Sequence, residues 1–101
     1  MSLPPINYER YFNWISKLPG VDGERVLQWL GEKNVIYRHQ ELYSLCNTKL
    51  ASAKGIPFVD VRQELLAIHN YSDYLCIDGI HLNEQGQKVL CDVFSRYATS
   101  M

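Results

Sequence analysis

The chain has 101 residues, a formal net charge of -1 and a hydrophobic fraction of 47%. This length allows one small domain, and the near-neutral charge argues against a nucleic-acid partner, which would need a surplus of Lys and Arg on one face. No apolar run approaches the roughly 20 residues of a membrane span, and no signal-peptide pattern is present. We expect residues 1–3 to be an expression leader and residues 4–101 to form a single domain.

Two short helices are predicted in the N-terminal third, over residues 8–18 and 24–30. Asn7 and Asp22 precede them as N-cap residues, because their side-chain oxygens can accept hydrogen bonds from the free N–H groups of a first helical turn. Pro19-Gly20 ends the first helix.

A longer helix is predicted over residues 35–54, and Gly55 stands where a helix commonly ends. Its apolar residues recur at helical spacing and form a stripe. The members of the stripe are Val35, Ile36, Leu42, Tyr43, Leu45, Cys46, Leu50 and Ala53.

Residues 56–61 are nearly all apolar and predict a strand that is buried on both faces, as in a parallel sheet. Pro57 has no N–H to donate, which confines the strand to an edge or puts the proline at its start. A short helical turn over 63–68 and a polar loop over 69–76 follow. One strand cannot form a sheet alone, since its backbone groups need neighbours. Part of the fold is therefore expected to be missing.

A last helix is predicted over residues 84–97, with Asn83 as its cap. Gly86 near its start costs up to about 1 kcal/mol relative to Ala, which suggests a close-packing position. The helix has one apolar face, made of Val89, Leu90, Val93, Phe94 and Tyr97.

The cysteines Cys46, Cys76 and Cys91 are odd in number and widely spaced, with no Cys-x-x-Cys pair. His39 and His69 have no second ligand at metal spacing, and no glycine-rich phosphate loop is present. We therefore expect free thiols in a reducing cytoplasm, with no metal and no cofactor.

Asp78 and His81 lie three residues apart on a loop that precedes the last helix. Asp78-Gly79 is a common turn pair, and a histidine beside a helix start is often a surface residue. The alternative interpretation is catalytic: a general-base histidine needs one ring nitrogen aimed at a nucleophile and the other held by a carboxylate. Asp78 has the position to supply that carboxylate.

The run from Gly55 to Val61, followed by "DGIHLNEQGQKVLCDVF" from Asp78 to Phe94, resembles the C-terminal half of SGNH hydrolases, the GDSL-type lipases, esterases and acylhydrolases. The last block of that family is an Asp-x-x-His loop followed by Asn and Gly, which Asp78, His81, Asn83 and Gly86 match in order. The resemblance implies an α/β fold: a C-terminal fragment of a three-layer α/β/α, flavodoxin-like architecture, mostly helical with one or two strands. Residues 4–101 would be a partial domain of this kind.

The same resemblance implies that His81 is the general base and that Asp78 orients it. The Gly-Asp-Ser block that carries the family's nucleophile is absent, as are the blocks that supply its oxyanion hole. We therefore expect a segment of a serine ester hydrolase that is inactive alone and meets an ester substrate only with the missing N-terminal half.

Apolar surface left uncovered in such a fragment predicts self-association into a homodimer or a larger oligomer. The alternative is a non-catalytic helical module that forms homo-oligomers. In that case Asp78 and His81 are turn and surface residues, and the N-terminal aromatic residues contribute to an interface. A polar surface around His81 without a shaped cleft would favour the module. A cleft floored by the end of the strand, with Asp78 contacting the His81 ring, would favour the hydrolase.

Overall fold

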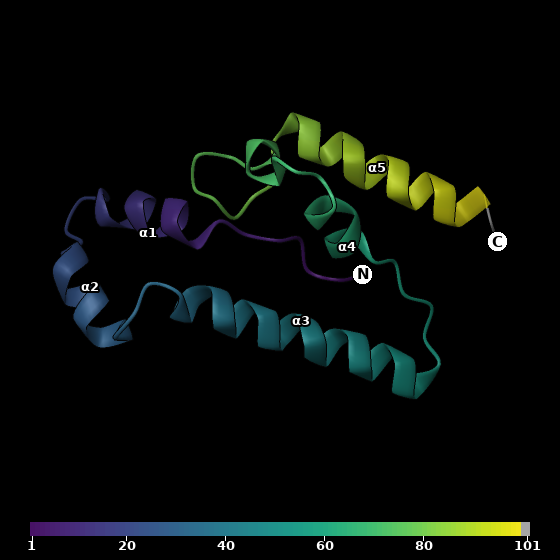
Figure 1. Cartoon of the computed structure of the whole chain (residues 1–101), viewed down its shortest axis with the longest axis horizontal. Coiled ribbons are helices and arrows are strands. Elements are labelled where there is room, and N and C mark those ends of the chain that lie inside the picture. The colour runs from purple at the N-terminus through teal and green to yellow at the C-terminus, as the bar shows by residue number, and fades with distance from the viewer. Residues whose placement is uncertain (100–101) are drawn as a thin grey trace.

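The computed structural model describes residues 1–99, which form six helical segments joined by loops (Figure 1). α3 runs along one side of the molecule, α4 and α5 lie on the other, and α1 and α2 close one end (Figure 1). None of these helices has both the length and the apolar character needed to cross a bilayer. In chain order the segments are α1 (Tyr8–Ser16), α2 (Gly23–Leu30), α3 (Val35–Lys54), α4 (Val61–Leu66), the 3-10 helix η1 (Tyr71–Tyr74) and α5 (Glu84–Thr99).

The helix ends confirm the capping residues predicted from the sequence. Asn7 Oδ1 accepts a hydrogen bond from the third backbone N–H after it at 3.0 Å, and Asp22 Oδ1 caps α2 in the same way. Gly55 ends α3 with a φ of 64°, a left-handed conformation that glycine adopts without steric cost. α3 has the predicted bounds, whereas α4 begins earlier than the predicted turn and α5 continues to Thr99.

The predicted α/β architecture, a fragment of a three-layer fold with one or two strands, is wrong. Residues 1–99 contain no strand, and the segment 56–60 is irregular. Its one backbone hydrogen bond to residues 1–6 runs from Ser2 N to Val59 O at 3.0 Å, which is too little pairing for a ladder. Pro4, Pro5 and Pro57 remove three donors from the two segments. The fold over residues 1–99 is helical.

Residues 1–6, which we call the N-terminal strap, pass between α3 and α4 and bond to segments far away in the sequence. Ser2, in the stretch expected to be a leader, is buried: its Oγ donates to Asp60 Oδ1 at 3.0 Å and accepts from Arg62 N at 2.9 Å. Carbonyls along the rest of the strap accept side-chain hydrogen bonds. The donors are Arg62 Nη1 to Leu3 O, Gln40 Nε2 to Pro4 O, and Tyr71 Oη to Ile6 O.

The molecule is more open than most chains of its size. Its radius of gyration is 15.6 Å, whereas a compact chain of this length has about 13 Å. It exposes 7133 Å², whereas a compact protein of this mass exposes about 5,900 Å². The hydrophobic core is correspondingly small and consists of Ile6, Phe12, Ala51, Val61, Leu65, Leu75 and Val93.

Candidate active site

A tight loop between η1 and α5 carries Asp78 and His81. Cys76 N donates to His81 O at 2.7 Å, and Gly79 N donates to Cys76 O at 3.0 Å, so the backbone turns back on itself. An isolated antiparallel bridge between Leu75 and Leu82 closes the base of this loop. The loop therefore has defined backbone partners at both ends, and the residues inside it are held in register.

The structure brings the two predicted site residues into direct contact. His81 Nδ1 lies 2.5 Å from Asp78 Oδ2. The other carboxylate oxygen, Oδ1, accepts from the backbone N–H groups of Ile80 at 3.0 Å and His81 at 3.1 Å. The Asp78 side chain is 13% exposed and that of His81 is 74% exposed. The carboxylate is thus fixed inside the loop, while most of the His81 side chain is exposed to solvent.

Two opposing influences act on the Asp78 carboxyl. Burial alone would raise its pKa, because burial disfavours the charged form. The hydrogen bond with the His81 side chain and the backbone N–H groups of Ile80 and His81 act against burial and bring the pKa below its ordinary value of 3.8. Asp78 is therefore a carboxylate at neutral pH, which is the state that holds an imidazole Nδ1–H.

α1 fixes the position of this loop through its N-terminus. Asn7 N donates to Gly79 O at 2.9 Å. Gly79 has a φ of 74°, and a Cβ at this position would lie 2.6 Å from Asn7 O and 2.9 Å from Tyr11 N. A side chain at residue 79 would therefore push the loop away from α1, and the close approach requires glycine.

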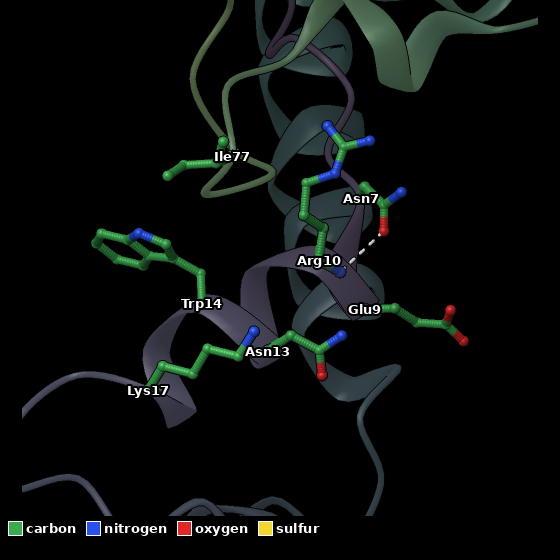
Figure 2. A pocket seen from close by; sticks show the side chains of 7 residues that line it. All are labelled: Asn7, Glu9, Arg10, Asn13, Trp14, Lys17 and Ile77. Atoms are coloured by element: carbon green, nitrogen blue, oxygen red, sulfur yellow. Dashed lines mark hydrogen bonds between the residues drawn. The ribbon is translucent and has the colours of Figure 1, made fainter.

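Arg10 provides a second connection between α1 and the loop, and the sequence analysis did not identify it. Its Nη1 donates to Ser72 O, within η1, at 2.7 Å and to Cys76 O, after η1, at 3.3 Å. Figure 2 shows this side chain rising from α1 toward the segment that bears Ile77. In the sequence Arg10 is an ordinary charged residue of an amphipathic helix, so no local signal distinguishes it.

A cleft of about 500 Å³ lies between α1 and this loop (Figure 2). Trp14 and Ile77 supply apolar surface, and Ile77 is the residue of the loop that lines the cleft, whereas Asp78 and His81 do not line it. The remaining walls are polar or charged. They consist of Asn7, Glu9, Arg10, Asn13 and Lys17.

The two other residues that match the family's block have structural roles. Asn83 Oδ1 accepts from Gly86 N at 3.0 Å, and Asn83 O accepts from Gln87 N at 2.9 Å, which confirms it as the cap of α5. A Cβ on Gly86 would collide with Tyr74 O and come within 3.0 Å of Leu82 Cβ. The predicted close packing at Gly86 is therefore confirmed, and it lets α5 begin directly against η1.

The arrangement can accept a proton at His81 Nε2 and stabilise the resulting imidazolium through Asp78. Within residues 1–99, Asp78 is the only side chain that hydrogen-bonds to the His81 ring. No group of three His, Cys, Asp or Glu side chains in that range could hold a metal ion. A scan against protein-family models and searches of curated proteins and of solved structures found no match to this chain.

Proposed function

We propose that His81 is the general base of a serine ester hydrolase of the SGNH kind and that Asp78 orients it. The observation that carries the proposal is the contact between His81 Nδ1 and Asp78 Oδ2, made by a largely exposed imidazole and a buried carboxylate. A base that must remove a proton from a hydroxyl needs this combination, because the held nitrogen fixes the ring and leaves the other accessible. The order of Asp78, His81, Asn83 and Gly86 in the sequence supports the same function.

The serine nucleophile in this proposal lies outside the chain. No serine of residues 1–99 hydrogen-bonds to the His81 ring, and no Gly-Asp-Ser block occurs in the sequence. The chain alone is then inactive, and a lipid-like or small ester reacts only when a second segment supplies the serine and its oxyanion hole. We also propose that the protein resides in a reducing compartment such as the cytoplasm, because all three cysteines are free thiols.

The test begins with the coding sequence upstream of residue 1 and in frame with it. The protein that includes this upstream segment is expressed, and its hydrolysis of short p-nitrophenyl esters is measured beside that of the present chain. We expect activity only in the longer protein. His81→Ala should lower kcat/KM by about 10³- to 10⁴-fold, and Asp78→Asn by a similar factor, because the imidazole loses its orientation.

His69→Ala is the matched control, because His69 is an exposed histidine outside the loop. It should leave kcat/KM unchanged. An upstream frame that lacks a Gly-Asp-Ser block, or hydrolysis that survives His81→Ala, would contradict the proposal.

A second candidate is a non-catalytic helical module that associates with itself, and the exposed surface favours it. The chain exposes 7133 Å², about 1,200 Å² more than a compact monomer of 11.7 kDa. A stable interface buries about 800 Å² on each partner. Light scattering at tens of micromolar should then give the mass of a dimer or a larger oligomer, and a monomer mass would contradict self-association.

A further inference from the structure

α3 buries its less apolar face and exposes the more apolar one. Its buried residues are Ser44 and Ala51, and Gln40 on the same side is bonded to the N-terminal strap. On the opposite side Leu42 is 61% exposed, Tyr43 68% and Leu50 58%. We call this side the α3 stripe. Its members recur at spacings of three or four residues, as on a single helical face, and they are His39, Leu42, Tyr43, Cys46, Leu50 and Ala53.

The α3 stripe has the shape that a second helix needs. A groove of about 230 Å³ is formed by His39, Leu42, Tyr43 and Cys46. Three of these side chains are apolar or aromatic. Leu50 stands one turn farther along the same face and is exposed. A groove beside a projecting leucine is the arrangement in which a side chain of one helix inserts between those of another.

Apart from Tyr43, the stripe is symmetric about Cys46. Leu42 lies four residues before Cys46 and Leu50 four residues after it, while His39 and Ala53 lie seven residues to either side. If two copies of α3 pack antiparallel with a two-fold axis beside Cys46, Leu42 meets the partner's Leu50 and His39 meets the partner's Ala53. Each of these pairs sets a large residue against a small or matching one, and a small residue stands at the crossing point. Tyr43 meets the partner's Lys49, whose aliphatic stem can lie along the ring.

We propose that the α3 stripe is the contact surface for a second copy of this chain, in an antiparallel homodimer centred on Cys46. The inference rests on the second proposed function, self-association, and is independent of the role of Asp78 and His81. The excess exposed surface of the whole chain is larger than one partner's share of a stable interface, and the exposed leucines and tyrosine of the α3 stripe contribute to it.

The charges beside the stripe predict how salt affects this dimer. Arg38 and Lys49 flank the stripe along one edge. A two-fold axis across the stripe brings that edge beside the same edge of the partner, so like charges face each other. Salt screens such repulsion, and the dimer should therefore bind more tightly as the salt concentration rises. A dimer that weakens with added salt would be held by opposite charges and would overturn this arrangement.

Cysteine cross-linking tests the arrangement on the wild-type chain. Cys46 and Cys91 are both exposed and free, and they lie on different helices. A short bismaleimide should produce a covalent dimer that is retained in Cys91→Ser and lost in Cys46→Ser. If the covalent dimer instead depends on Cys91, the contact lies on α5 and the inference is wrong.

Sedimentation equilibrium on surface variants tests separately whether the chain self-associates and whether the α3 stripe is the surface through which it does so. Leu42→Glu with Leu50→Glu should raise the dimer Kd by about 100-fold or more, because two leucines lose their burial. Trp29→Ser is the control, since Trp29 is exposed on α2, and should leave Kd unchanged. Circular dichroism verifies that the variants fold. A wild-type monomer would refute self-association itself, whereas a dimer that the two glutamates leave intact would refute only the α3 stripe as its surface.

Discussion

Asp78 uses its two carboxylate oxygens in different ways. Oδ1 accepts from the backbone N–H groups of Ile80 and His81, which fixes the turn, and Oδ2 contacts His81 Nδ1. The same side chain therefore stabilises the loop and orients the imidazole. Any substitution at residue 78 changes both, so its effect on stability must be measured separately from its effect on activity.

The lowered pKa of Asp78 predicts a pH-dependent contribution to stability. A carboxyl whose pKa is lower in the folded state than in the unfolded state stabilises the fold above its unfolded value, which is 3.8 here, and this contribution is lost as the pH falls through the folded pKa. Asp78→Asn should lower the free energy of unfolding by about 1–3 kcal/mol at pH 7. The difference from wild type should shrink as the pH falls below about 4.

Urea denaturation at a series of pH values measures this difference. Asp92→Asn is the control, because Asp92 is exposed on α5, and it should change the free energy of unfolding by less than about 0.5 kcal/mol at any pH. A cost of Asp78→Asn that is the same at pH 3 and pH 7 would show that the carboxylate charge does not stabilise the loop.

The sequence allowed us to predict the contact between Asp78 and His81 because both residues belong to one short loop. The turn at Gly79 was also predictable, because Asp-Gly is a common turn pair. Its close approach to Asn7 and Tyr11 was not predictable from the sequence. The role of Arg10 could not be predicted from the neighbouring sequence, since its partners are carbonyls more than 60 residues away. Local geometry was predictable, whereas the attachment of the loop to α1 depends on tertiary structure.

At the scale of the elements, helix bounds were predicted well because capping is local. Asn7, Asp22 and Asn83 each act on N–H groups within the next few residues. The strand over 56–61 was predicted wrongly for the opposite reason, because a strand exists only through pairing with another segment. Residues 1–6 provide one backbone hydrogen bond to it, through Ser2 and Val59. The segment is apolar, as a buried strand would be, but it does not pair with a second segment and is therefore not a strand.

One side chain of α4 makes polar contacts with two side chains of α3. Arg62 is buried, and its Nη2 pairs with Glu41 Oε2 at 2.7 Å while Nη1 donates to Gln40 Oε1 at 2.7 Å. Arg62→Ala should lower the free energy of unfolding by about 2–3 kcal/mol, because the Glu41 carboxylate and Gln40 Oε1 both lose their donor in a partly buried site.

Arg25→Ala is the matched control for Arg62. Arg25 forms an exposed ion pair with Asp22 at 3.6 Å, and such pairs contribute less than about 1 kcal/mol. Urea denaturation of the two variants should therefore give clearly different midpoints. Equal midpoints would indicate that α3 is held by something other than Arg62.

At the scale of the whole molecule, the N-terminal strap is the segment to which several helices are bonded. It has few regular backbone hydrogen bonds of its own, yet α3, α4 and η1 all bond to its carbonyls or to Ser2. Pro5 and Ile6 within it are buried. The helices contact one another little, apart from α1 with α2, α4 with α5, and α5 with η1. The strap thus connects elements that would otherwise be separate.

This dependence predicts that the strap is required for cooperative folding. A chain that begins at Asn7 should lose the single sharp thermal transition, because Gln40 and Arg62 both lose their bonds to the strap and α3 keeps only the direct contacts of Arg62 with Gln40 and Glu41. Circular dichroism during heating measures the transition, and amide hydrogen exchange on α3 should become fast. A chain that ends at Tyr97 is the control and should keep the transition, because Ala98 and Thr99 are exposed. If the chain without the strap unfolded with the same Tm and the same sharpness, the fold would have to be held by direct helix packing instead.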